Sequence, residues 1–141
     1  MMNKTKVVRI IIVLFMASLP FFACESLYVD CNECYFYEPD SADLFVQVTI
    51  NDENPFVPLI FYKGNVRDSV VEWIDTATAE NFFLFSPVHQ FFSVVAKYRV
   101  GDKVIFAIDG DELKTNYQAD VCTETCYTIT GGEMDVRLKF E

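Results

Sequence analysis

The five cysteines are the residues of this chain with the most evident chemistry. They are Cys24, Cys31, Cys34, Cys122 and Cys126. A thiol can be acylated, form a disulfide, bind zinc or act as a redox group, and its surroundings decide which of these it does. Cys24 directly follows a long apolar run, whereas the other four form two closely spaced pairs that lie far apart in the chain. The sequence therefore predicts two separate roles for these residues.

Residues 1–23 have the layout of a secretion signal. Three basic residues precede an apolar run over residues 10–23, which Pro20 interrupts and which ends in the small residue Ala23. The apolar part of a signal peptide is about 7–15 residues long and ends in a small residue before the cleavage point. A membrane-spanning helix needs about 20 apolar residues. We therefore expect cleavage after Ala23 rather than a membrane span.

The segment Phe21-Phe22-Ala23-Cys24 resembles the lipobox of bacterial lipoproteins. In that family the cysteine thiol is acylated with fatty acids such as palmitate and becomes the first residue of the mature protein. The resemblance implies a membrane anchor at Cys24. Each buried methylene group contributes about 0.8 kcal/mol to membrane binding, so two or more acyl chains anchor a protein stably. The resemblance also places the protein in the cell envelope, at the outer membrane or cell surface rather than the inner membrane. An ordinary signal with a nearby cysteine is the alternative.

Charge and length limit the partners and the number of domains. Residues 24–141 hold eight Lys and Arg against 21 Asp and Glu, which gives a net charge of −13. This charge disfavours nucleic acid and anionic membrane surfaces as partners. A chain of this length forms one domain. We predict a signal peptide over 1–23, a tether and connecting segment over 24–42, and one folded domain over 43–141.

The cysteines that follow Cys24 are even in number, which in a small exported domain indicates disulfides. Pairing within each doublet would constrain the unfolded chain little, whereas pairing across them closes loops worth up to about 4.7 kcal/mol each. We favour cross-pairing and assign no partners. Two alternatives remain. Cys31-Asn32-Glu33-Cys34 has the spacing of a redox motif, and the two doublets have acceptable spacing for zinc, but an oxidising exterior favours disulfides.

Alternating apolar and polar residues dominate the folded part, which indicates strands with one buried face. Residues 68–80 fit a helix or a strand, and their β-branched side chains favour a strand over 70–75. The pattern predicts an all-β sandwich, immunoglobulin-like or prealbumin-like, of about 7–9 strands. The expected strands cover residues 43–51, 56–63, 70–75, 81–85, 91–99, 103–109, 113–121, 127–130 and 134–141.

Glycine and proline place the expected turns and edges. Pro58 indicates an edge strand or a bulge. Gly101-Asp102 predicts a tight turn, and Gly131-Gly132 predicts a two-residue hairpin. Residues 109–111 (Asp-Gly-Asp) predict another turn with solvated acids. With Glu112 they could also offer oxygens to calcium, although without the spacing of the twelve-residue calcium loop.

Two further resemblances concern the folded part. The segments 75–78, 82–85 and 92–98, with a turn at Pro87, resemble immunoglobulin-like and prealbumin-like sandwich modules. Phe92 stands where those modules carry a tyrosine, so the corner hydrogen bond of a phenol is expected to be absent. The chain also resembles small, uncharacterised exported lipoproteins of Bacteroidetes-type bacteria, which implies no activity. The matching segments are 54–59, 91–94, 107–111, 131–132 and 135–139.

The candidate functional residues favour binding over catalysis. His89 is the only histidine, lies in an expected turn and is expected to be solvated; no nucleophile elbow or phosphate-binding loop occurs. We therefore predict a non-enzymatic module without cofactor or metal that binds an envelope protein or a glycan. A carboxylate-dependent hydrolase and a carrier of apolar ligands are the alternatives. Adjacent aromatic residues cannot all face one core. The candidate ligand surface comprises Tyr62, Trp73, Phe83 and Phe91.

Overall fold

The computed structural model describes residues 29–139, so Cys24, the expected signal peptide and residues 140–141 lie outside it. Within this part all regular elements are strands except two short 3-10 turns, and no helix is long and apolar enough to cross a membrane. The elements are η1 (Cys31–Glu33), β1 (Ser41–Gln47), β2 (Val57–Lys63), η2 (Val66–Asp68), β3 (Val71–Ala77), β4 (Asn81–Pro87), β5 (Phe91–Val100), β6 (Lys103–Glu112), β7 (Lys114–Tyr117), β8 (Tyr127–Thr130) and β9 (Glu133–Asp135).

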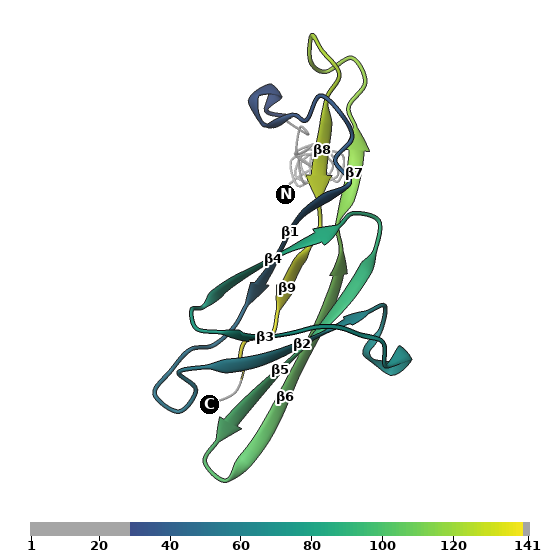
Figure 1. The fold of residues 1–141 in the computed structure, drawn as a ribbon. Helices are drawn as coiled ribbons and strands as arrows, with labels where there is room; N and C mark the ends of the chain where they lie inside the picture. Colours follow the sequence, from purple (N-terminus) through teal and green to yellow (C-terminus); the bar gives the residue numbers. More distant parts are fainter. Residues whose placement is uncertain (1–28, 140–141) are drawn as a thin grey trace, which may run out of the picture.

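Two sheets pack against each other and confirm the predicted all-β sandwich (Figure 1). One sheet has the order β3-β2-β5-β6 and is antiparallel throughout. The other has the order β4-β1-β9, in which β1 is antiparallel to β4 and parallel to β9. The hairpin β7-β8 forms a third, two-stranded sheet at one end of the molecule, beside the segment that leads into β1.

The core lies where the inward rows of the two sheets meet. Leu44 and Val46 of β1 face Phe61 of β2 and the β5 row that contains Phe92 and Val94, and all five side chains are buried. The period-two pattern predicted these inward rows correctly. Because a slip of one residue would turn each row toward water, the pattern also fixes the register of the strands.

The ambiguous stretch 68–80 contains strand β3, as favoured. Trp73 lies opposite Phe61 in the register of β2 and β3 and packs against Phe61 and Phe92. The register shifts beside this pair, between Phe61 and Tyr62, which leaves Glu72 as an unpaired bulge residue. The β-branched residues therefore favoured the strand over the helix, because such side chains pack well on a half-buried sheet surface.

Several local predictions were wrong. Pro58 does not mark an edge strand, because β2 lies inside its sheet and its pairing with β5 begins only at Leu59. A bulge, the other outcome expected from Pro58, does occur in the β2-β3 ladder, but between Phe61 and Tyr62. Residues 109–111 do not turn but continue β6. Gly131-Gly132 does not close a hairpin, because β8 pairs with β7 whereas β9 pairs with β1. The strand expected over 113–121 ends at Tyr117, where the chain leaves for the cysteine-containing loop.

A buried phenol supplies a link that the sequence did not predict. Tyr98 of β5 donates a hydrogen bond to the carbonyl oxygen of Val136 (2.8 Å) and accepts one from the backbone N–H of Thr49 (3.1 Å). Phe92 has no phenol, as noted from the sequence, but the hydroxyl group of Tyr98 joins the ends of β1 and β9 to the opposite sheet. Burial raises the pKa of the Tyr98 phenol above its ordinary value of 10.0.

We expect Tyr98→Phe to lower the free energy of unfolding by about 1–3 kcal/mol, since it leaves the two backbone partners without their hydrogen bond. The free energy of unfolding of the wild-type protein should itself fall as the pH rises above 10.0. In this range the phenol of the unfolded chain ionises, while the buried phenol of the folded protein stays protonated. Urea unfolding at neutral and alkaline pH, followed by the fluorescence of the single tryptophan, measures both effects.

The phenylalanine variant is its own control for the alkaline effect. It lacks the titrating group, so the stability difference between the two proteins should shrink as the pH rises through the raised pKa of Tyr98. A difference that stays constant from neutral to alkaline pH would contradict the assignment of this phenol as buried and protonated.

Candidate binding surfaces

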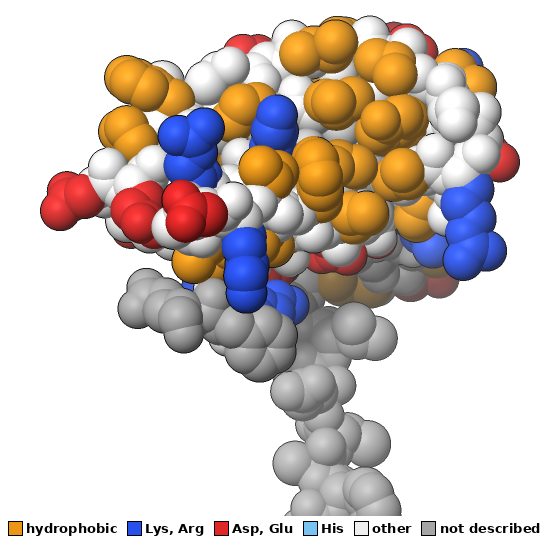
Figure 2. All heavy atoms as spheres, turned by 90° about the horizontal axis from the view of Figure 1, so that it is seen from below, with side chains coloured by type: hydrophobic (Ala, Val, Ile, Leu, Met, Phe, Trp, Pro, Cys, Tyr) orange, Lys and Arg blue, Asp and Glu red, His pale blue; other side chains and the backbone are white. Residues whose placement is uncertain are grey.

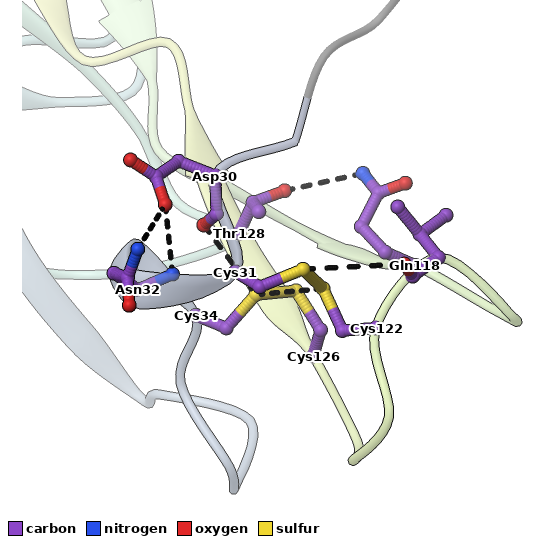
Figure 3. Close-up of a disulfide and its surroundings, with 9 residues drawn as sticks. Asp30, Cys31, Asn32, Cys34, Gln118, Cys122, Cys126 and Thr128 are labelled. Carbon is purple, nitrogen blue, oxygen red and sulfur yellow. Dashed lines mark hydrogen bonds between the residues drawn. A yellow bond between two sulfur atoms is a disulfide. The ribbon is translucent and has the colours of Figure 1, made fainter.

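Two neighbouring disulfides fasten the N-terminal segment to the loop between β7 and β8 (Figure 3). Cys31 bonds to Cys122 and Cys34 to Cys126, so the pairing runs across the two doublets as favoured. The bridges lie side by side, with 3.8 Å between the Sγ atoms of Cys34 and Cys122. Just beyond them, the backbones of Tyr35 and Tyr127 exchange two hydrogen bonds of 2.9 Å. The segment before β1 therefore belongs to the folded structure.

None of these four sulfur atoms is a free thiolate, because each is part of a disulfide. The Sγ atoms of Cys34, Cys122 and Cys126 lie within 4.8 Å of one another, the kind of cluster that could hold a metal ion if the thiols were free. Each sulfur is instead bonded to another. Metal binding and thiol redox chemistry both require a thiolate. The cluster therefore acts as a covalent clamp. Its first doublet lies on extended chain and a short 3-10 turn, so no α-helix N-terminus is present there to stabilise a thiolate.

His89 is half exposed, as expected, but has polar partners. Its Nε2 atom lies 2.8 Å from the Thr115 hydroxyl group and 3.4 Å from a carboxylate oxygen of Glu38. The Thr115 hydroxyl group also donates to Glu38, and this bond is the main cause that lowers the pKa of the carboxyl group. In a catalytic triad the acid binds the ring nitrogen that faces away from the nucleophile. Here Thr115 and Glu38 both contact the same ring nitrogen of His89, which differs from the triad arrangement. The three side chains instead join the N-terminal segment to β7.

Two acids of β6 accept hydrogen bonds from the backbone of residues 132–135. The Asp111 carboxylate accepts hydrogen bonds from the N–H groups of Gly132 (2.7 Å) and Glu133 (3.1 Å). The Asp109 carboxylate accepts one from the N–H group of Asp135 (2.7 Å). These acids thus cap the edge of β9 that faces away from β1, and an uncapped edge of this kind would invite pairing with another strand.

The outer side of the β3-β2-β5-β6 sheet carries a broad apolar surface, which we call the four-strand face. Its central row runs across all four strands, because Ile74 pairs with Ile60, Ile60 with Val95, and Val95 with Ile108. Several of these side chains are strongly exposed, with 72% for Ile74 and 58% for Ile108. The apolar residues at outward positions are Pro58, Ile60, Tyr62, Val71, Ile74, Phe91, Val95, Val104, Phe106 and Ile108.

Viewed from below Figure 1, hydrophobic side chains gather into a wide patch with Lys and Arg side chains beside it (Figure 2). The register places Lys97 beside Phe106 and Arg99 beside Val104 at outward positions of the four-strand face. At one border, η2 forms a groove with Phe91 and Ile108. Apolar patches of this extent are uncommon on soluble monomers and mark interaction surfaces.

The outer side of the β4-β1-β9 sheet carries a smaller aromatic surface, which we call the three-strand face. Phe83 and Phe85 of β4 are 60% and 68% exposed, and Phe45 of β1 lies opposite Phe83 with 5.2 Å between the ring centroids. Acidic side chains surround these rings at outward positions, with Asp43 opposite Phe85 and Glu133 opposite Phe45. This surface therefore combines exposed aromatic rings with negative charge.

Of the four aromatic residues predicted as a ligand surface, only Tyr62 and Phe91 lie on the same face. Trp73 points into the sandwich and packs on the core. Tyr62 is half buried on the four-strand face, and Phe83 lies on the three-strand face. Phe91 lies on the four-strand face, where it covers Gly110, and a Cβ added at Gly110 would lie 2.8 Å from the Phe91 ring. The four residues therefore do not share one face, because adjacent aromatics only indicate that some of them must face outward.

Sequence reasoning missed most of the residues that form the two faces. The exposed side chains of β6 alternate with partly buried ones, a signal that was visible in the sequence, but grouping them with β2 and β3 requires the strand order. The charge of the three-strand face also depends on geometry. Arg137 donates hydrogen bonds to Asp135 and holds the pKa of this carboxyl group well below its ordinary value, so this acid is already paired.

Comparison with known proteins gives no match to a protein family, to a curated protein or to a solved structure.

Proposed function

We propose that this chain is a lipid-anchored lipoprotein of the bacterial cell envelope whose folded domain is a non-catalytic module that binds a protein partner. The observation that carries the binding role is the pair of exposed apolar sheet faces, which lie outside a core that is complete without them. Large contiguous apolar surfaces in a soluble domain mark partner sites. The flat, mostly aliphatic four-strand face suits a protein better than a glycan, which favours isolated aromatic platforms.

Export is supported by the signal layout and by the disulfides. Disulfides persist in oxidising compartments and are rare in the cytosol. A domain of this size with two bridges across its N-terminal segment fits an extracytoplasmic location. The lipobox-like segment that ends in Cys24 then supplies the anchor, and the resemblance to small exported lipoproteins agrees with this proposal.

A binding role is favoured over a hydrolase and over a carrier of apolar ligands, because the acids and core side chains that those two functions would need already make other contacts. A carboxylate-dependent hydrolase needs two acids that face each other in a cleft, whereas Asp109 and Asp111 accept backbone hydrogen bonds. A carrier of apolar ligands needs space between the sheets. That region is packed with fully buried side chains, among them Phe61, Tyr98 and Leu44.

The anchor is tested by growing cells that produce the full chain in the presence of radioactive palmitate. We expect the wild-type protein to incorporate label and to float with membranes, and Cys24→Ala to do neither, because the acylated thiol is gone. Cys31→Ala is the matched control, since it removes the next cysteine along the chain and should keep the label. Equal labelling of Cys24→Ala and wild type would exclude Cys24 as the lipid site.

A further inference from the structure

The two disulfides are in contact with each other (Figure 3). The Sγ atoms of Cys34 and Cys122 belong to different bridges and lie 3.8 Å apart, and together with Cys126 they form a group within 4.8 Å. In thiol–disulfide exchange, a thiolate attacks one sulfur of a disulfide and the other sulfur leaves. If the Cys31–Cys122 bridge opens, the Cys122 sulfur is therefore already beside a disulfide that it can attack.

The four cysteines differ strongly in their exposure to solvent. Cys31 is exposed, Cys34 and Cys122 are partly buried, and Cys126 is fully buried. In the loop over residues 119–125, every residue except Cys122 is exposed. Exposed disulfides are the ones that solvent thiols reduce most readily. A thiolate from solvent therefore reaches the Cys31–Cys122 bridge before the other bridge, and it reaches this bridge at Cys31.

The charge around this bridge limits the kind of thiol that fits it. Four acids and no basic residue lie within two positions of Cys31 or Cys122 along the chain, namely Asp30, Glu33, Asp120 and Glu124. Like charges slow the approach of a partner. The site therefore disfavours an anionic thiol such as glutathione and favours a dithiol with neutral or basic surroundings.

We propose that the paired bridges form a site of thiol–disulfide exchange, at which a dithiol attacks Cys31 and the opening is passed on to Cys126. The first thiolate of the dithiol bonds to the Cys31 sulfur, and Cys122 leaves as a thiolate. Cys122 then bonds to Cys34, and Cys126 leaves as a thiolate. The second thiolate of the dithiol displaces Cys31 and closes a cyclic disulfide. Cys31 and Cys126 each take up a proton, so two electrons pass from the dithiol to the protein and one bridge remains.

The two possible forms of the remaining bridge are similar in free energy. Cys34 is 88 residues from Cys122 and 92 residues from Cys126, so chain entropy hardly distinguishes the two loops. A protonated Cys126 suits its buried position, because a free cysteine packs as a small apolar side chain. The Cys122 side chain, once released from Cys31, can rotate about its Cα–Cβ bond toward Cys34. We therefore expect both forms to be populated, within about tenfold of each other.

The N-terminal segment stays fastened to the loop in both forms, since Cys34 keeps a covalent partner. The backbones of Tyr35 and Tyr127 exchange two hydrogen bonds of 2.9 Å directly beside Cys34 and Cys126, and the N–H group of Gln118 donates to the Cys126 carbonyl oxygen (2.9 Å). These bonds keep the released thiol near its former partner, so oxidation can restore both bridges. The site thus loosens the clamp by one bridge without detaching the domain from the segment that leads to Cys24.

Two variants that remove the same bridge test the exchange without any reductant. Cys31→Ala leaves the Cys122 thiol in contact with Cys34, whereas Cys122→Ala leaves the Cys31 thiol, which lies outside the group of three sulfurs. Each protein is purified from cells that produce the full chain, quenched and unfolded in acid, and blocked with N-ethylmaleimide. Peptide mass spectrometry then identifies the blocked cysteines and distinguishes Cys24 from the others.

The expected results differ between the two variants. In Cys31→Ala, about one tenth or more of the chains should carry the label on Cys126 and the others on Cys122, because the two forms exchange freely. In Cys122→Ala, the thiol that remains in the clamp should carry the label on Cys31 alone.

The wild-type protein tests the point of attack and needs no substitution. It is treated with limiting dithiothreitol, an uncharged dithiol, and the chains that retain one bridge are blocked and mapped in the same way. We expect Cys31 to be labelled in nearly all of these chains, with the second label divided between Cys122 and Cys126. Label on Cys34 should be at least about tenfold rarer than label on Cys31, because Cys34 belongs to the bridge that remains.

Three results would each overturn the exchange site. Label confined to Cys122 in the Cys31→Ala variant would show that the sulfur contact does not lead to exchange. Label spread over several clamp cysteines in the Cys122→Ala variant would show general scrambling, which does not depend on that contact. Label mainly on Cys34 and Cys126 in the wild-type protein would show that the buried bridge opens first. None of these results depends on palmitate at Cys24 or on a partner at the apolar faces, so the exchange site and the proposed function can fail separately.

Discussion

Removal of both disulfides is expected to lower the free energy of unfolding by about 7 kcal/mol, a loss comparable with the whole stability of a small domain. Removal of either bridge alone should cost only about 2–3 kcal/mol. The reason is the arrangement of the bridges. The two pairs, Cys31–Cys122 and Cys34–Cys126, span 91 and 92 residues. The bridge that remains in a single-bridge variant still closes the long loop, so only a small additional ring is lost.

The measurement compares three variants in which cysteines are replaced by alanine: one lacking Cys31 and Cys122, one lacking Cys34 and Cys126, and one lacking all four. Urea unfolding of each is followed by the fluorescence of Trp73, which packs against two core phenylalanines. The loss in the third variant should exceed the sum of the first two, because the bridges share one loop. A strictly additive result would show that the two bridges act independently of this shared loop.

The two single-bridge variants also control for each other. Their loops are nearly equal in length, so chain entropy affects them equally. Cys126 is fully buried whereas Cys31 is exposed. We therefore expect the variant lacking Cys34 and Cys126 to lose more, since it also leaves a space where the buried sulfur packed.

The core and the class of fold could be predicted because they depend on a repeated pattern. Leu44 and Val46 on β1, and Phe92 and Val94 on β5, alternate with outward residues over a whole strand. Because several residues of a strand repeat the alternation, one residue that departs from it does not change the predicted inward row. The cross-pairing of the cysteines followed from their even number and from the long loops that it closes. The choice between its two versions could not follow, because both close loops of almost equal length.

The local predictions failed where a tertiary contact decided the outcome. Gly131-Gly132 is a common hairpin signal, yet here it lets the chain pass from the β7-β8 sheet to the β1-β9 pair. Asp109 and Asp111 have the composition of a turn, but their carboxylates cap the backbone of a strand that is distant in sequence. No local pattern reveals such a partner. The two faces likewise depend on strand order, since the sequence shows which side chains point outward and not which strands are neighbours.

Substitution of Gly131 by alanine is expected to lower the free energy of unfolding by about 2–5 kcal/mol, although it adds a single methyl group. Gly131 has a φ of +75°, which costs an L residue about 1–2 kcal/mol. The added Cβ atom would also lie 2.3 Å from the carbonyl oxygen of Glu112. Because that oxygen belongs to the backbone of β6, relief requires one of the two segments to move, and the adjoining N–H group of Gly132 would then leave Asp111.

Gly101 is the matched control, because it separates the two causes. Its φ is +57°, but an added Cβ atom would meet nothing within 4 Å. Gly101→Ala should therefore lose only the conformational part, about 1–2 kcal/mol. The difference between the two variants in urea unfolding measures the cost of the close approach between the Gly131 turn and β6. Equal losses would mean that the end of β6 yields freely, and that the carboxylate caps of Asp109 and Asp111 do not hold β9 in a fixed position.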